Sequence, residues 1–275
     1  MPLSPELRDL RMALDVGAFA QAIGWMPDPW QQSVLHSRSP RILLNCSRQA
    51  GKSTVASLLS SHRAVYRPNS TILLASPSLR QSGELFRKVQ DVMRRVKGAP
   101  RALEDNKLSL ALENGSRIVS LPGAEATVRG FSSVDLLIED EASRVPDALY
   151  RAMRPMLAVS NGRLILMSTP FGKRGHFFEE WIGKADWERY EVPATECPRI
   201  SKAFLEEERA TVGPWWFAQE YCCVFGDTVD SLFTHGDIMA AMKGDIPDLF
   251  AADEVGAAAA GAVADIPGIG GLLDG

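Results

Sequence analysis

Hydrophobic and polar positions along the chain follow two alternating patterns. Short apolar runs such as Ile42-Leu43-Leu44 and Thr71–Ala75 are typical of strands that are buried on both faces. The segments that follow them, Val55–Tyr66 and Leu79–Lys97, carry apolar residues at helical spacing. Strands that alternate with helices predict an α/β fold with a central, mainly parallel sheet and helices on both faces.

The same patterns predict the remaining elements. Residues 6–23 combine charged and apolar positions at helical spacing and predict one helix on the outside of the core. Lys107–Glu113 and Ser116–Leu121 alternate polar and apolar residues around Asn114-Gly115, which predicts a hairpin. Two prolines before Gln31 predict an extended entry into a short helix. Further elements are expected at Val134–Ala142 (strand), Asp147–Val159 (helix), Arg163–Met167 (strand), His176–Trp181 (helix), Trp187–Val192 (strand), Ser201–Thr211 (helix) and Trp215–Tyr221 (helix).

Composition is that of an ordinary globular protein. The 275 residues are 45% hydrophobic and 23% charged, which is enough for one large core or two small ones. No apolar run approaches the length of a membrane span, and the N-terminus lacks the features of a signal peptide. We therefore expect a cytoplasmic protein without a membrane partner. The four cysteines have no metal-ligand spacing and predict reduced thiols.

Charge is distributed unevenly along the chain. Residues 226–275 hold nine acidic residues and one lysine, a net charge of −8, whereas the preceding residues carry +4. A mildly basic body permits contact with nucleic acid without requiring it. The basic residues of Leu79–Lys97 suit DNA phosphates, although such a run is more often a solvated helix face.

A phosphate-binding loop follows the apolar run at residues 42–44. Gly51, Lys52 and Ser53 match the end of the pattern G-x-x-x-x-G-K-[ST], and Cys46 stands where the first glycine is expected. Loop amides and the start of the next helix would hold the β- and γ-phosphates of ATP, Lys52 would neutralise them, and Ser53 would bind Mg²⁺. The residues predicted to surround the phosphates are Ser47, Arg48, Gln49, Ala50, Gly51, Lys52, Ser53 and Thr54.

An acidic strand end supplies the second half of the predicted site. The strand at residues 134–138 runs into Glu139, Asp140 and Glu141. Buried carboxylates at a strand tip need a compensating cation, which Mg²⁺ with a triphosphate provides. Asp140 is expected to act at the metal through its water shell, and Glu141 is expected to deprotonate the attacking water. Glu139 leaves open a shift of these roles by one residue. We expect this strand to lie next to the strand of the phosphate-binding loop.

Three other polar positions are candidates for nucleotide contacts. Ser168 and Thr169 end a strand that we expect beside the loop strand, where a hydroxyl can sense the γ-phosphate, although a helix cap explains them equally well. Gln31 follows an aromatic residue upstream of the loop, and its amide can bind an adenine edge or simply lie exposed on a helix.

Taken together, these motifs resemble the ATPase domain of the large terminase subunit of tailed double-stranded DNA phages. The resemblance covers about residues 25–235 and includes Trp30-Gln31, the loop form S-R-Q-x-G-K-S-T, Val128-Arg129-Gly130, Leu137–Ala142, Ser168-Thr169-Pro170 and Gln219-Glu220-Tyr221. It implies a P-loop ATPase that uses ATP and Mg²⁺ to thread double-stranded DNA through a portal protein into a procapsid. The implied partners are the portal, the small terminase subunit and further copies of this chain in a ring.

The resemblance also implies roles for individual residues. Gln31 becomes an adenine contact, Lys52 and Ser53 the phosphate and Mg²⁺ ligands, Asp140 the acid of the metal site and Glu141 the catalytic base. Arg48 becomes a charge-stabilising arginine in cis. Arg129 matches a position that reaches the ATP of a neighbouring subunit in some members, and a surface or salt-bridge arginine is the competing interpretation.

The expected organisation is a P-loop ATPase domain at residues 1–225, with its core at about 25–170 and a small, aromatic-rich lid subdomain at about 171–225. An acidic Ala/Gly-rich tail follows at residues 226–275. We expect no nuclease activity, because the tail is too short for the nuclease domain of full-length large terminases. A helicase-like or recombination ATPase remains an alternative, as does a remnant that binds nucleotide or portal without turnover.

Overall fold

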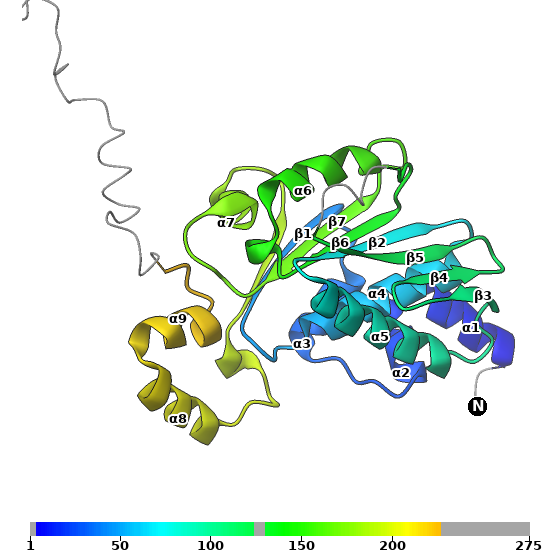
Figure 1. Cartoon of the computed structure of the whole chain (residues 1–275). Helices are drawn as coiled ribbons and strands as arrows, with labels where there is room; N and C mark the ends of the chain where they lie inside the picture. The colour runs from blue at the N-terminus through cyan, green and yellow to red at the C-terminus, as the bar shows by residue number, and fades with distance from the viewer. Residues whose placement is uncertain (1–3, 124–129, 227–275) are drawn as a thin grey trace, which may run out of the picture. The chain divides into compact units, whose positions relative to one another are not determined.

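One mixed sheet organises the molecule (Figure 1). The computed structural model describes residues 4–123 and 130–226, which belong to one compact unit. The described part of the chain forms an eight-stranded sheet in the order β3-β4-β5-β2-β6-β7-β1-β8. Its strands are β1 (Arg41–Cys46), β2 (Thr71–Ser76), β3 (Ala102–Asp105), β4 (Ser109–Leu112), β5 (Arg117–Pro122), β6 (Leu136–Asp140), β7 (Arg163–Ser168) and β8 (Glu188–Val192).

In the sheet, the six neighbouring strands β5, β2, β6, β7, β1 and β8 run parallel to one another. β4 pairs antiparallel with β5, and β3 pairs antiparallel with β4 at the edge. This arrangement confirms the predicted mainly parallel sheet and the hairpin of β4 and β5. Because parallel strands end at one edge of a sheet, the carboxyl ends of β1, β6 and β7 lie together. β7 separates β6 from β1, however, so the prediction that the acidic strand lies next to the loop strand was wrong.

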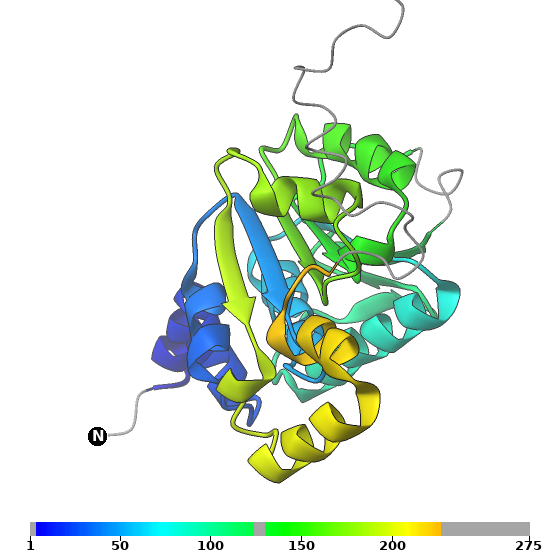
Figure 2. The same cartoon turned by 90° about the vertical axis from the view of Figure 1, so that its left-hand side faces the viewer.

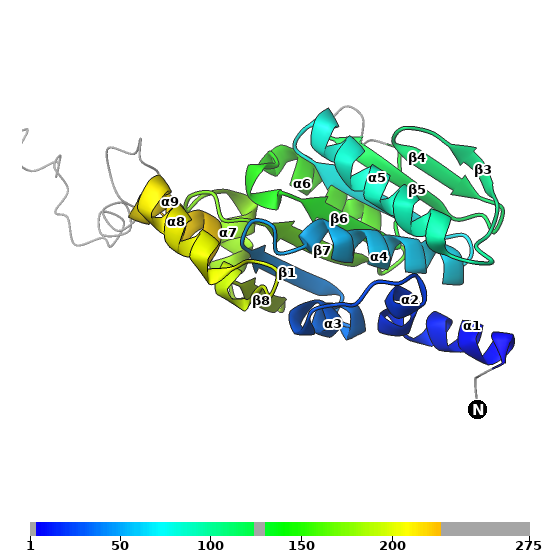
Figure 3. The same ribbon diagram turned by 90° about the horizontal axis from the view of Figure 1, so that it is seen from below.

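Helices cover both faces of the sheet. α2 (Val16–Ala22), α3 (Pro29–His36), α4 (Lys52–Tyr66) and α5 (Leu79–Arg95) pack on one face, which Figure 3 views from their side. α6 (Asp147–Met153), η3 (Arg154–Leu157) and α7 (Gly175–Ile182) pack on the other. Buried strand residues contribute to both layers: Ile42 and Leu44 face α4, whereas Leu43 faces the α6 layer. Burial on both faces explains the uninterrupted apolar runs of the strands.

The first predicted helix is broken in two. The chain forms α1 (Pro5–Leu14) and then α2, because Asp15 adopts an extended conformation. Its carboxylate accepts hydrogen bonds from the N–H groups of Gly17 and Ala18 at 2.7 and 3.1 Å and caps α2. Helical spacing alone does not reveal this break.

The last elements extend the sheet and then leave it. β8 pairs with β1 as an edge strand, and η4 (Ala194–Glu196), α8 (Lys202–Val212) and α9 (Pro214–Cys222) follow its end (Figure 2). α9 returns to the loop strand through hydrogen bonds from Arg48 N to Glu220 O and from Asn45 Nδ2 to Cys223 O. β8 is therefore part of the central sheet. The predicted domain boundaries and the lid subdomain stay predictions.

Candidate active site

The turn after β1 has the backbone of a phosphate-binding loop. It ends at Gly51, whose φ is +99°, and α4 begins at the next residue. A Cβ atom on Gly51 would lie 2.6 Å from Nε2 of Gln31. Glycine is therefore required at this position both by the left-handed backbone and by the close approach of a side chain. The turn leads directly into the N-terminus of α4, where unpaired N–H groups favour an anion.

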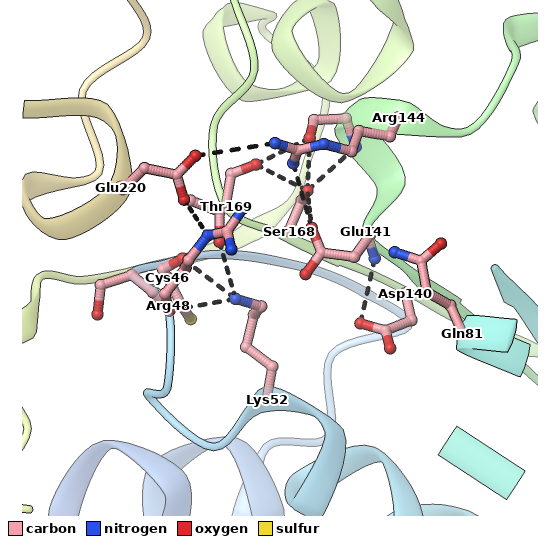
Figure 4. Close-up of polar contacts among 12 residues, drawn as sticks. Cys46, Arg48, Lys52, Gln81, Asp140, Glu141, Arg144, Ser168, Thr169 and Glu220 are labelled. Carbon is pink, nitrogen blue, oxygen red and sulfur yellow. Dashed lines mark hydrogen bonds and ion pairs between the residues drawn. The ribbon is translucent and has the colours of Figure 1, made fainter. Parts of the chain in front are cut away.

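Cys46 and Lys52 lie on different sides of this turn. Cys46, which replaces the first glycine of the pattern, belongs to the hydrophobic core, and burial raises the pKa of its thiol to about 12. Lys52 is 7% exposed, and its Nζ donates to Cys46 O, Ser47 O and Thr169 Oγ1 at 3.3, 3.2 and 3.1 Å (Figure 4). The ammonium group thus lies between the loop and the end of β7.

The end of β6 brings Asp140 and Glu141 to the same place. Burial raises the pKa of Asp140 to about 7, with the Glu141 carboxylate as the second cause, while Lys52 and Lys88 act in the opposite direction. Glu141 has a φ of +54°, and its N–H donates to Asp140 Oδ1 at 3.1 Å. This turn ends the strand, and the side chains of Asp140 and Glu141 point in different directions, as Figure 4 shows.

Glu139 takes no part in this arrangement. Side chains alternate along a strand, and Glu139 lies on the α7 face, where its Oε2 is 3.2 Å from Nε2 of His176. The other imidazole nitrogen, Nδ1, is 2.9 Å from Asp147 Oδ1. Burial raises the pKa of Glu139, and the hydrogen bond from His176 only partly opposes it. Glu139 therefore lies away from the pocket, and the division of roles between Asp140 and Glu141 stays a prediction.

Ser168 and Thr169, at the end of β7, lie between the two halves of the site. Ser168 Oγ donates to Glu141 Oε2 at 3.4 Å, and Thr169 Oγ1 accepts from Lys52. Ser143, which the sequence analysis did not single out, fixes this point: its Oγ lies 2.6 Å from Ser168 Oγ and donates to Thr169 O at 2.8 Å. The pair at residues 168 and 169 therefore contacts the lysine from one side and the glutamate from the other.

These elements enclose a pocket of about 490 Å³. Its walls come from the loop, α5, the turn after β6 and the segment after β8. The lining residues are Arg48, Gln49, Gly51, Lys52, Ser53, Thr54, Gln81, Lys88, Glu141, Arg144 and Arg199. Of the predicted site residues, Ser47, Ala50, Asp140, Ser168 and Thr169 are buried and do not line the pocket.

Gln31 is fully buried beneath the loop. Its Oε1 accepts from Asp28 N at 2.8 Å, and its Nε2 donates to Ala50 O at 3.4 Å. It is neither an exposed helix residue nor a lining residue of the pocket, and its amide supports both the start of α3 and the loop. The adenine contact stays a prediction.

Arg48 lines the pocket and contacts α9. Its side chain is 61% exposed and forms an ion pair between Nε and Glu220 Oε2. Glu220 in turn lies 3.8 Å from Arg144 through Oε1 and Nη2. Arg129, the predicted arginine in trans, lies outside the described residues.

Several residues of the pocket have no predicted role. Arg144 follows Glu141 by three residues, and its Nη1 is 3.4 Å from Glu141 Oε2. Arg199 reaches the loop from the segment before α8, with 2.8 Å from its Nη2 to Ala50 O and 2.6 Å from its Nη1 to Asp28. An arginine three residues after the acidic motif is a local signal that could have indicated Arg144 as a residue of the site. No local pattern indicates Arg199, because its partners Ala50 and Asp28 lie far from it in the sequence.

The donor atoms present fit Mg²⁺. Ser53 lines the pocket, and burial raises the pKa of the nearby Asp140 carboxyl to about 7, as expected of a carboxylate that a cation would stabilise. Among the described residues there is no cluster of three or more His, Cys, Asp or Glu side chains that could hold a metal ion. Mg²⁺ prefers oxygen ligands and commonly takes one or two from the protein and the others from phosphate and water. The site therefore suits an ion that arrives with a nucleotide.

Comparison with known families identifies the chain. The model of the family described as "Terminase large subunit, T4likevirus-type, N-terminal" matches residues 43–239. The chain belongs to this terminase family. That match spans the loop, the acidic strand and the segment through α9, and it confirms the resemblance drawn from the motifs.

Individual terminases show the same relationship. The large terminase subunit of Thermus virus P23-45 is 25% identical over 257 residues, which cover 80% of this chain and 53% of the relative. The chain thus spans about half the length of the curated relatives that it matches.

Solved terminase structures share the fold. The large terminase ATPase domain of Thermus phage P74-26 superposes with a TM-score of 0.65 at 22% identity, covering 76% of this chain and 97% of that domain. The large terminase of bacteriophage D6E in complex with ADP has a TM-score of 0.59 at 16% identity, covering 72% and 54%. These likenesses confirm the predicted P-loop NTPase fold.

Proposed function

We propose that this chain hydrolyses ATP and that the energy released moves double-stranded DNA. The observation that carries the proposal is that Lys52 and Glu141 line one pocket, although they come from strands separated by β7. A lysine for phosphate charge and a carboxylate for an attacking water are the two groups that hydrolysis of a triphosphate needs at close quarters. Family membership and a relative bound to ADP are consistent with this assignment.

The chemistry divides among the residues of the pocket. Loop amides and Lys52 bind the β- and γ-phosphates, and Thr169, which contacts the lysine, fixes its position. Glu141 accepts a proton from water as the water oxygen bonds to the γ-phosphorus. The bond from that phosphorus to the bridging oxygen breaks, and its electron pair remains on ADP. Mg²⁺, held by Ser53 and through water by Asp140, would neutralise charge on the phosphate oxygens.

Coupling to DNA belongs to the same proposal. Ser168 and Thr169 contact both Lys52 and Glu141, so a change at the γ-phosphate reaches the end of β7. We infer that the aromatic-rich segment after residue 170 closes on the nucleotide in response, and that Arg129 serves the ATP of a neighbouring copy. The proposed partners are double-stranded DNA, a portal protein, the small terminase subunit and further copies in a ring.

The proposed place of action is the host cytoplasm, where phage DNA is packaged. No helix in the described ranges 4–123 and 130–226 has the length and apolar character needed to cross a membrane.

Steady-state ATPase measurements with Mg²⁺ test the proposal. We expect Lys52→Ala and Glu141→Gln each to lower kcat by about 10²-fold or more, because one removes phosphate charge compensation and the other the general base. Lys107→Ala and Glu113→Gln are matched controls on exposed residues of the hairpin, away from the pocket. Equal rates in the wild type and in both pocket variants would remove the enzyme assignment and leave a nucleotide-binding module.

A forked duplex separates the proposal from the helicase-like alternative. A packaging motor translocates along intact duplex and does not separate its strands. ATP-dependent displacement of one strand would therefore contradict the packaging role while leaving ATP hydrolysis in place.

A further inference from the structure

Four charged side chains of alternating sign form a series at the pocket, and three of them, Arg48, Arg144 and Glu141, line it. Arg48 pairs with Glu220, Glu220 lies 3.8 Å from Arg144, and Arg144 lies 3.4 Å from Glu141. Figure 4 shows this series running from α9 to the turn after β6. It joins the arginine of the phosphate-binding loop to the proposed catalytic base through two residues to which no role has been assigned.

The two carboxylate oxygens of Glu220 differ in their hydrogen bonding. Oε2 is paired with Arg48, whereas Oε1 is buried and has no hydrogen-bond partner among the described residues. Glu220 as a whole is only 8% exposed. A buried carboxylate oxygen without a donor is energetically unfavourable. The group placed to satisfy it is the guanidinium of Arg144, which lies just beyond hydrogen-bond length.

Arg144 lies between two carboxylates: it donates a long hydrogen bond of 3.4 Å to Glu141, and it lies 3.8 Å from Glu220, beyond hydrogen-bond length. Its Nη1 faces Glu141 and its Nη2 faces Glu220, so a small tilt of one guanidinium strengthens one contact and weakens the other. The guanidinium also lies 4.3 Å from the centre of the Phe171 ring, which supports it from one side. In the proposed reaction, the Glu141 carboxylate must accept a proton from the attacking water. Its pairing with Arg144 therefore competes with that role.

We propose that Glu220 and Arg144 are positioning residues that determine when Glu141 is free to act. A triphosphate in the pocket competes for Arg48, since three phosphate groups offer this exposed guanidinium more negative charge than one carboxylate does. Once Arg48 leaves, Glu220 has two oxygens without donors, and Arg144 moves to them. Glu141 then loses its arginine and turns to the attacking water. This inference rests on the proposed function of the pocket.

The exchange makes the release of the base depend on the nucleotide. With Arg48 on Glu220, Arg144 remains on Glu141, and a water molecule in the pocket meets no free general base. With Arg48 on the phosphates, the same four residues form different pairs, and no charge is left buried alone. The exchange also joins α9 to the site, because Glu220 belongs to that helix.

A double-variant experiment tests the exchange. In Glu220→Gln the neutral amide no longer attracts Arg144, which remains on Glu141, so we expect kcat for ATP to fall about tenfold, a size typical of a partly buried ion pair. KM for ATP is expected not to rise, because Arg48 is free to bind phosphate. Adding Arg144→Gln removes the group that holds Glu141, and the double variant is expected to recover kcat to within about twofold of the wild type. Arg144→Gln alone is expected to raise kcat.

Controls separate this inference from a structural role and from the proposed function. Arg154→Gln is the matched control, because Arg154 forms an ion pair of 3.1 Å with Glu180 outside the pocket; thermal unfolding of every variant reports on folding. A double variant as slow as Glu220→Gln, or an Arg144→Gln variant that is itself slow, would overturn the exchange and make Arg144 a direct phosphate contact. A wild-type rate no higher than that of Lys52→Ala would overturn the proposed function and the exchange together.

Discussion

Gly51 is the residue at which the backbone of the site is most constrained. Its φ of +99° is strained for any other residue, and a Cβ atom would meet Gln31 at 2.6 Å and Arg199 at 3.1 Å. We expect Gly51→Ala to lower the free energy of unfolding by about 1–3 kcal/mol, because it adds a left-handed alanine and displaces the buried amide of Gln31. Affinity for ATP should fall as well, since the loop changes shape. Chemical denaturation and equilibrium binding of a fluorescent ATP analogue measure the two effects.

Gly98 provides the matched control. Its φ is +77°, and nothing lies within 4 Å of an added Cβ atom. Gly98→Ala therefore carries the backbone strain without the contact. If the two variants lose equal stability and both bind ATP normally, the contact between Gly51 and Gln31 has no role in shaping the loop.

His62 gives the fold a dependence on pH. Burial lowers the pKa of this imidazole below its ordinary value of 6.5, against the opposing effect of its hydrogen bond to Met12 O and of a backbone hydrogen bond with Ala13. A histidine that resists protonation in the folded state stabilises the fold above the unfolded pKa, and this contribution is lost as pH falls below about 6.5. We expect the wild type to lose more stability than His62→Gln between pH 7 and pH 5. Urea denaturation across that range measures the difference, and parallel pH profiles would contradict the assignment.

Single residues were predictable where the chemistry is local in sequence. Lys52, Ser53, Asp140 and Glu141 fall inside short motifs whose spacing predicts a role; Lys52, Ser53 and Glu141 line one pocket, and Asp140 ends β6 beside Glu141. Glu220 and Arg199 meet the loop from 172 and 149 residues away. Contacts of that kind depend on how the chain closes on itself, so no pattern in a single sequence reveals them.

At the scale of elements, Asp15 separates α1 from α2 and holds α2 against α3. Its carboxylate caps α2 and lies 2.8 Å from Nε2 of His36. We expect Asp15→Ala to lower the free energy of unfolding by about 1–2 kcal/mol, the usual cost of removing an N-cap. Ser4→Ala is the matched control, because Ser4 caps α1, a helix without buried residues. Denaturation curves compare the two, and an equal effect would show that the position of Asp15 between helices adds nothing.

Elements were predicted well where burial imposes a pattern. β1, β2, β6 and β7 are buried on both faces and appear in the sequence as apolar runs. β3 escaped prediction because Ala102–Asp105 is exposed along its whole length and pairs only at the edge of the sheet. The order of the strands was also missed in one respect, since apolar runs do not show that β7 lies between β6 and β1.

At the scale of the whole molecule, the pocket is built from parts of the chain that lie far apart in the sequence. Its lining comes from the loop, from α5, from the turn after β6 and from the segment before α8. A ligand that contacts all of them binds the folded chain and not the unfolded one, so it shifts the unfolding equilibrium by mass action. The free energy of unfolding, measured with and without ligand, should therefore show whether the pocket binds nucleotide, even in a variant that hydrolyses ATP slowly.

We expect ATP-γ-S with Mg²⁺, at about 100 times its dissociation constant, to add about 2.7 kcal/mol to the free energy of unfolding. For a domain of this size the melting temperature should rise by about 5–10 °C. Lys52→Ala should lose most of this rise, because its ammonium group is the buried cation at the centre of the pocket, and Asp140→Asn should lose the part that depends on Mg²⁺. Differential scanning fluorimetry with and without EDTA measures both effects. An equal rise in the wild type and in Lys52→Ala would place the nucleotide somewhere other than this pocket, and the catalytic assignment of Glu141 would fall with it.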